Sequence, residues 1–164
     1  MNLYLTADTI GQESGGGVVT KNECGALKTL DSTMILGRES LQKSPKFNPA
    51  NDPWCWDQAA LEEISGQIKL CHIYAGTFSD TVAKLQGQGT KVTITCAAHD
   101  IELSRKAHEE LGMAFPYSHL TELELWEKYS RGYRKADVLI CPSSVAAETC
   151  RKQGCNNRIE IIPH

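Results

Sequence analysis

The sequence lacks the short motifs that identify several common enzyme classes. It has no GxGxxG fingerprint for a dinucleotide and no GxxxxGK[ST] loop for a nucleoside triphosphate. A GxSxG nucleophile elbow is absent, and so is the Tyr-x-x-x-Lys pair of short-chain reductases. The sequence therefore does not support a hydrolase of the elbow type, a P-loop enzyme or an ordinary short-chain reductase.

Long apolar runs and an excess of positive charge are also missing. No segment approaches the roughly 20 apolar residues of a membrane-spanning helix, and the first residues lack the basic lead and apolar core of a signal peptide. The net charge of -3 argues against nucleic acid as the main partner. These features predict a cytoplasmic protein, including the inner face of the membrane, where peripheral contact would need no spanning helix.

The cysteine pattern does not predict a metal site or a disulfide framework. There are seven cysteines, an odd number, with no CxxC pair and no Cys/His cluster at zinc spacing. Cys71, Cys96 and Cys141 each lie inside an apolar run. The simplest interpretation is that the cysteines are small buried hydrophobes in a reducing compartment.

Composition and periodicity together predict one α/β domain over residues 1–164. With 41% hydrophobic and 23% charged residues, the chain has the composition of a folded globular protein. Strand and helix patterns alternate, which predicts a Rossmann-like, doubly wound parallel sheet with helices on both faces. The predicted strands are 1–7, 34–37, 68–75, 91–97, 137–141 and 158–162. The predicted helices are 18–30, 58–64, 79–86, 101–111, 120–133 and 145–153.

Residues 41–57 interrupt this alternation. Three prolines in this segment predict a long loop without regular structure. It carries Trp54 and Trp56, which either line a binding pocket or cover an edge of the core.

Ligands of such a sheet bind beyond the carboxyl ends of its strands. The first of these places is a polar turn over residues 9–17 that closes on Gly15, Gly16 and Gly17. Glycines let a ligand approach the backbone, and the helix that follows would present free amides and a positive dipole end to an anion. The alternative is a mobile surface loop. Residues 76–80, 99–100 and 143–144 are the other places at this edge, and Ser144 is predicted to cap the last helix.

Two histidines receive different interpretations. His99 stands directly after the predicted strand 91–97, and Asp100 beside it is either the cap of the next helix or a substrate contact. His72 lies in the middle of an apolar strand, so we predict a core histidine with a satisfied ring nitrogen.

Five segments in order resemble one enzyme family. They are Val18 onwards after the triple glycine, IKLCHIY at 68–74, TITCAAHD at 93–100, VLICPS at 138–143 and RIEIIPH at 158–164. Together they resemble the amino-terminal domain of the retaining nucleotide-sugar glycosyltransferases of the large family four, which have the GT-B fold. The resemblance covers nearly the whole chain, although each motif is loose. The chain departs from the family at Tyr74, where a second histidine is common, and at Ala97 and Ala98, which widen the approach to His99.

The resemblance implies a division of labour between two Rossmann-like domains that face each other across a cleft. The amino-terminal half, represented by this chain, would hold a sugar or lipid-linked acceptor. Its expected partner is its own carboxyl-terminal domain, which binds the nucleotide-diphosphate sugar and whose acidic motif and basic diphosphate clamp have no counterpart here. The donor is a substrate, so neither a cofactor nor a metal is expected.

The family also implies roles for particular residues. Gly16 and Gly17 match the Gly-Gly turn whose amides lie near the donor phosphates, and Gly15 beside them is also an expected substrate contact. His99 matches the histidine that touches the reacting sugar and is the expected catalytic residue, while Asp100 and Ser143 are expected substrate contacts. Transfer with retention is thought to let the leaving diphosphate help to accept the acceptor's proton, so that the protein positions the reactants and stabilises charge.

Two other functions remain open for the same sheet. One is an NAD(P)-dependent nucleotide-sugar epimerase or reductase, which the missing GxGxxG and Tyr-x-x-x-Lys motifs disfavour. The other is a binding module or regulatory subunit without catalysis.

Overall fold

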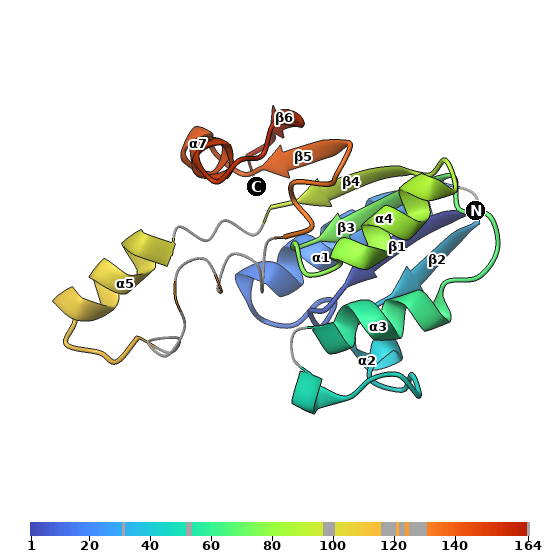
Figure 1. The fold of residues 1–164 in the computed structure, drawn as a ribbon, viewed down its shortest axis with the longest axis horizontal. Coiled ribbons are helices and arrows are strands. Elements are labelled where there is room, and N and C mark those ends of the chain that lie inside the picture. Colours follow the sequence, from blue (N-terminus) through green and yellow to red (C-terminus); the bar gives the residue numbers. More distant parts are fainter. Residues whose placement is uncertain are drawn as a thin grey trace.

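The computed structural model describes residues 1–30, 32–51, 54–96, 101–115, 121, 124 and 131–163. A six-stranded sheet with every strand parallel to its neighbours forms its centre (Figure 1). The spatial order is β2-β1-β3-β4-β5-β6. The strands are β1 Asn2–Thr6, β2 Thr33–Leu36, β3 Leu70–Tyr74, β4 Lys91–Thr95, β5 Val138–Cys141 and β6 Arg158–Ile161. The predicted α/β, Rossmann-like fold is therefore confirmed, and each predicted strand end lies within two residues of the observed one.

Helices flank this sheet on both faces. The described helices are α1 Gly15–Lys28, α2 Arg38–Leu41, the short 3-10 helix η1 Pro49–Asn51, α3 Trp54–Glu63, α4 Ser79–Gly87, α5 Ile101–Glu110 and α7 Ser144–Lys152. Among them, none has both the length and the apolar composition that crossing a membrane requires.

Four helix predictions need correction. The first helix begins at Gly15 and not after the glycines, because Ser14 caps it from outside. Residues 41–57 are not a continuous loop, since η1 begins at Pro49 and α3 begins at Trp54. Ser143, not Ser144, caps α7. The described residues 131–135 form turns and not the end of a helix, and most of the predicted helix 120–133 lies outside the described residues.

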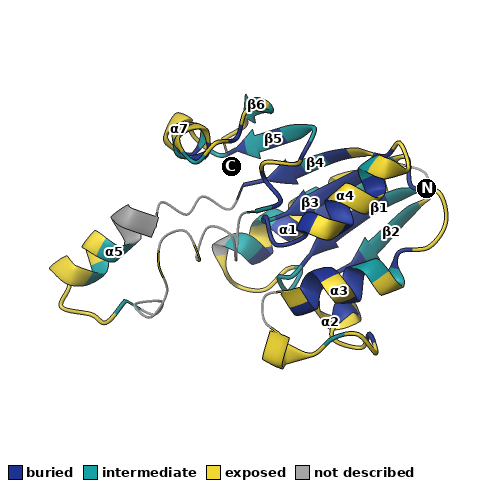
Figure 2. Ribbon diagram, in the orientation of Figure 1, coloured by how far each residue is buried: buried dark blue, intermediate teal, exposed yellow. Residues whose placement is uncertain are grey.

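Successive side chains along the strands point to opposite faces of the sheet and pack into two separate cores. Leu3 and Leu5 of β1 point into the larger core, which is covered by α3, α4 and α7. Tyr4 points to the opposite face and joins Tyr74 and Cys24 in a smaller core beneath α1. Figure 2 shows that α3 and α4, which lie in front of the sheet in this view, each carry both buried and exposed residues. This two-faced burial is what the strand patterns of a doubly wound sheet predict.

The long segment before β3 is held by aromatic packing. Trp56 is 9% exposed and packs against Phe47, with ring centroids 4.7 Å apart. The Arg38 guanidinium lies 5.3 Å from the centroid of the Trp56 ring. Of the two tryptophans, Trp56 therefore covers the core, while Trp54 is 44% exposed.

All seven cysteines are free and buried, as the sequence predicts. Burial raises the pKa of the Cys71 thiol. Hydrogen bonding with Cys141, together with burial, raises the pKa of Cys96 to about 12. The thiols of Cys71 and Cys96 are therefore neutral near pH 7 and pack as small apolar groups.

Candidate functional site

The order in which successive strands join the sheet reverses at β1, between β2 and β3. The chain passes from β1 to β2 on one side and then returns to place β3 on the other side of β1. In doubly wound sheets the crevice outside the carboxyl ends of the strands at this reversal is the usual place for a ligand. Tyr74 ends β3 at this edge, Asp8 follows β1, and α1 begins with its glycines after the next turn.

Gly16 faces two polar side chains at this reversal. A Cβ placed on Gly16 would lie 3.2 Å from Oδ2 of Asp8 and 3.2 Å from the Tyr74 hydroxyl. The three residues therefore meet, although they come from the first loop, the first helix and the third strand. Together with Gly15 they form what we call the switch-point site: Asp8, Gly15, Gly16 and Tyr74.

The hydroxyl of Tyr74 is a neutral hydrogen-bonding group. Burial raises its pKa, and the negative charges of Asp8 and Glu23 raise it further. The hydroxyl therefore stays protonated and can both donate and accept a hydrogen bond. The Asp8 carboxylate beside it only accepts hydrogen bonds when ionised. This pair suits a hydroxyl-rich ligand.

The start of α1 supplies the opposite charge. Ser14 caps the helix, and its Oγ accepts a hydrogen bond from the Gly17 amide at 3.0 Å. No acidic residue lies in the first turn. The amides of Gly15 and Gly16 have no acceptor within the helix, because the first N–H groups of any helix lie before the first full turn. These amides and the positive end of the helix dipole favour an anion.

Gly17 has an internal role in this turn. A Cβ on Gly17 would come within 2.1 Å of the Gln12 carbonyl oxygen, so the chain requires glycine here. The Gly17 carbonyl accepts a hydrogen bond from the Gly11 amide at 3.0 Å, and its own amide is already bonded to Ser14. Its predicted contact with substrate stays a prediction, and the amides that have no acceptor within the helix are those of Gly15 and Gly16.

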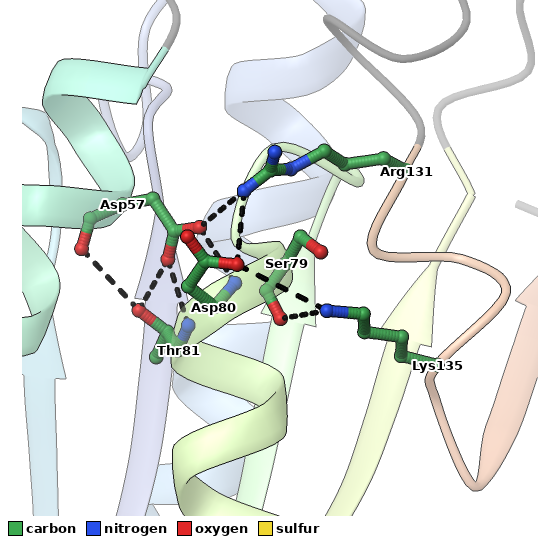
Figure 3. Close-up of polar contacts among 6 residues, drawn as sticks. All are labelled: Asp57, Ser79, Asp80, Thr81, Arg131 and Lys135. Atoms are coloured by element: carbon green, nitrogen blue, oxygen red, sulfur yellow. Dashed lines mark hydrogen bonds and ion pairs between the residues drawn. The ribbon is translucent and has the colours of Figure 1, made fainter.

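The start of α4, at residues 76–80, is closed by the protein itself (Figure 3). The buried carboxylate of Asp57, from α3, accepts hydrogen bonds from the amides of Asp80 at 2.7 Å and Thr81 at 2.8 Å. The Thr81 hydroxyl donates to the same carboxylate at 2.6 Å. Because Asp57 satisfies these amides, this helix start does not offer them to a ligand.

Two cations complete this cap. Nη2 of Arg131 lies 3.1 Å from Oδ1 of Asp80 and 3.5 Å from Oδ2 of Asp57. Lys135 donates to the Ser79 carbonyl at 3.3 Å. Nothing in the local sequence pattern could have paired Arg131 with Asp57 or Lys135 with Ser79, because these contacts join distant parts of the chain.

A buried polar network lies beneath the switch-point site. Oε1 of Glu23, on α1, is 3.3 Å from Nε2 of His72, on β3. The Thr95 hydroxyl donates to Glu23 at 2.5 Å, and the Tyr4 hydroxyl donates at 3.0 Å. Burial alone would raise the pKa of Glu23, but hydrogen bonds from His72, Thr95 and Tyr4 and the His72 charge outweigh it, and the pKa is lowered. Sequence reasoning did not identify Glu23.

His72 is the core histidine that the sequence predicts. Its residue is 8% exposed, and Nδ1 lies 2.7 Å from the Thr93 hydroxyl. Its other ring nitrogen faces Glu23 and Thr95. Both nitrogens therefore have partners inside the protein.

The remaining predicted site residues are not brought into the switch-point site. His99 and Asp100 lie outside the described residues. Ser143 follows β5 at the same edge of the sheet, where its exposed Oγ accepts a hydrogen bond from the Ala146 amide at 3.2 Å. Its role as a substrate contact stays a prediction. Thr77, which sequence reasoning did not single out, has a buried hydroxyl shortly after β3 with no hydrogen-bond partner among the described residues.

A small hollow lies at the carboxyl end of β2, beside the loop that follows Asp8. Its lining residues come from the β1–α1 loop, from β2 and from the start of α2: Thr9, Ile10, Ile35, Gly37, Arg38, Glu39 and Ser40. The hollow therefore lies on the β2 side of the point where the strand order reverses.

Comparison with known proteins does not identify a family for this chain. No protein-family model matches the chain, and no curated protein matches it.

Proposed function

We propose that this chain is the acceptor-side, Rossmann-like domain of a cytoplasmic, retaining nucleotide-sugar glycosyltransferase of the GT-B type. One observation carries the proposal: Gly16, at the start of α1, faces Asp8 and Tyr74 at the reversal of the sheet. An anion-binding helix start beside a carboxylate and a neutral hydroxyl suits a ligand that is both phosphorylated and rich in hydroxyls. The five ordered motifs support the same assignment.

The two sides of the switch-point site would divide such a ligand between them. The amides of Gly15 and Gly16 would bind an oxygen of the donor diphosphate. Asp8 would repel phosphate, and so its carboxylate would accept hydrogen bonds from hydroxyls of a sugar, with Tyr74 beside it. The orientation of the donor would then follow from charge: phosphates toward the helix start and hydroxyls toward Asp8.

The proposed reaction is a single group transfer. The acceptor hydroxyl oxygen forms a bond to the anomeric carbon of the donor sugar, and the bond from that carbon to the diphosphate oxygen breaks. The acceptor's proton passes to the leaving nucleoside diphosphate. His99 would contact the reacting sugar as the catalytic residue, and the other residues would position it and stabilise charge.

The partners follow from the same proposal. A carboxyl-terminal domain would supply the donor site across a cleft, and the acceptor would be a sugar or a lipid-linked sugar. A lipid-linked acceptor would bring the protein into peripheral contact with the inner face of a membrane.

Titration of the 164-residue chain tests the site directly. The chain is labelled with 15N-glycine, and its amide resonances are followed as UDP-glucose, GDP-mannose or NAD+ is added. We expect a nucleotide sugar to shift the Gly15 and Gly16 resonances, and Gly16→Val to abolish the shift of the remaining Gly15 resonance by crowding the amides. Gly25→Ala, in the same helix and with no atom within 4 Å of the new methyl group apart from its chain neighbours and the adjacent helix backbone, is the matched control.

The alternatives predict other outcomes. Stoichiometric uptake of NAD+ in place of nucleotide sugars would favour an epimerase or reductase. If no nucleotide shifts these resonances, either in this chain or in the protein that carries both halves, the switch-point site is not a donor contact, and a binding module without catalysis becomes the better assignment.

A further inference from the structure

Three buried cysteines converge at the carboxyl ends of β4 and β5. Cys96 directly follows β4, Cys141 is the last residue of β5, and Cys150 lies on α7, which covers them. Their sulfur atoms all lie within 4.8 Å of one another, and those of Cys96 and Cys150 are 3.5 Å apart. We call these three residues the thiol cluster.

The thiol cluster is enclosed and its outer neighbours are hydrogen-bond donors. Cys96, Cys141 and Cys150 are 3%, 0% and 2% exposed. Buried Cys155 hydrogen-bonds with the thiol of Cys150, and the Tyr133 side chain hydrogen-bonds with that of Cys96. The positive charges of Arg134 and Arg151 act on Cys155. Donors and positive charge around a group of sulfurs would stabilise thiolates bound to a metal.

We propose that the thiol cluster binds a single copper(I) ion through three sulfur atoms. Three sulfurs about 2.3 Å from one metal ion stand about 3.8 to 4.0 Å apart, and the sulfurs here require only small adjustments to reach this separation. Thiolate sulfur is the ligand that soft metal ions prefer. On binding, each of the three S–H groups loses its proton to solvent and forms a sulfur–copper bond, with no change of oxidation state.

Coordination number selects copper(I) over zinc. Structural zinc is almost always four-coordinate, but Cys155 is not among the residues whose sulfurs lie within 4.8 Å of one another. Copper(I) accepts three sulfur ligands, and Cys155 would then support the site by hydrogen bonding to Cys150. The inference is independent of the proposed glycosyltransferase function, because α7 covers the face of the sheet opposite α1.

The test is an anaerobic titration of the reduced chain with copper(I) against a competing copper(I) chelator. We expect one equivalent to bind and X-ray absorption to show three sulfur neighbours only. Cys141→Ser and Cys150→Ser should each weaken binding by roughly 100-fold or more. Cys71→Ser, at a buried cysteine outside the thiol cluster, is the matched control and should bind as the parent does.

Measurements on the unmodified chain keep the proposal testable if a variant fails to fold. Bound copper(I) should raise the midpoint of thermal unfolding and protect Cys96, Cys141 and Cys150 from alkylation, as read by mass spectrometry. Absence of binding, a coordination shell with oxygen or nitrogen, or equal loss in Cys71→Ser would overturn the proposal. A stoichiometric four-sulfur zinc complex under the same conditions would overturn the choice of metal.

Discussion

The carboxylate of Glu23 on α1 lies 3.3 Å from Nε2 of His72 on β3, so an ionisable pair ties the first helix to the centre of the sheet. Hydrogen bonds from Tyr4 of β1 and Thr95 near the end of β4 satisfy the same carboxylate. Three strands thus converge on one helix residue. The ring of His72 also stacks on that of Tyr4, with centroids 5.8 Å apart.

Because of this network, the free energy of unfolding should decrease as the pH falls. The pKa of Glu23 in the folded protein lies below its ordinary value of 4.5, so the ionised carboxylate stabilises the fold fully above that value. The contribution is lost as the pH falls through the lowered pKa of the folded state, because Glu23 is then protonated in both states. Glu23→Gln should reduce the free energy of unfolding by about 1 to 3 kcal/mol near pH 7.

Urea unfolding from about pH 7 to about pH 3 checks this prediction. The difference between the parent and Glu23→Gln should shrink below pH 4.5. Glu13→Gln, at an exposed residue, should change stability by less than about 0.5 kcal/mol at every pH. A constant difference between parent and Glu23→Gln across the range would show that the charge of Glu23 does not contribute.

Replacing the glycines of α1 with alanine should change the free energy of unfolding by different amounts. Gly17→Ala should cost about 1 to 3 kcal/mol, because its Cβ would overlap the Gln12 carbonyl at 2.1 Å and the loop must move. At Gly16 the nearest atoms are the ends of the Asp8 and Tyr74 side chains at 3.2 Å, which can yield, so Gly16→Ala should cost less than about 1 kcal/mol. Gly25→Ala should stabilise the helix by about 0.5 to 1 kcal/mol.

Chemical denaturation of the three variants measures these differences. Equal losses at Gly16 and Gly17 would contradict the separation of a ligand-facing glycine from a packing glycine.

Asp57 should matter far more than its neighbour Asp80. Asp57→Ala removes the cap of α4 and leaves the amides of Asp80 and Thr81 and the Arg131 guanidinium without their buried partner. We expect a loss of about 2 to 4 kcal/mol in the free energy of unfolding. Asp80→Ala, whose side chain is 61% exposed, should cost less than about 1 kcal/mol. Comparable effects of the two substitutions, measured by urea unfolding, would show that Asp57 is not the principal cap.

The sequence predicts the individual strands and helices well and the contacts between them poorly. Apolar runs such as β4 and helix stops such as Gly154 are local signals, and they locate strands and helices to within a few residues. The proximity of Gly16 to Tyr74, or of Cys96 to Cys150, depends instead on which strands become neighbours. No spacing rule contains that information, because the residues are 58 and 54 positions apart.

Helix starts show the same limit on a smaller scale. Ser143 and Ser144 are equivalent caps by residue type, and only the backbone geometry selects Ser143. Likewise, three glycines predict a turn by their conformational freedom, but Ser14 places them inside the first turn of α1. Residue type identifies the presence of a cap, and the packing of the helix on the sheet fixes its position.

The two histidines give the sharpest test of the proposed function. If His99 contacts the reacting sugar, His99→Ala in the protein that carries both halves should lower kcat/KM by roughly 10- to 1,000-fold, as expected for a lost positioning or charge-stabilising contact. Its thermal unfolding should hardly change. His72→Ala should instead reduce the free energy of unfolding by about 1 to 3 kcal/mol, because Glu23 and Thr93 lose a buried partner. Steady-state kinetics and thermal unfolding of both variants separate the two roles. A His99 variant that is fully active, or that is inactive only because it unfolds, would remove His99 from the catalytic assignment.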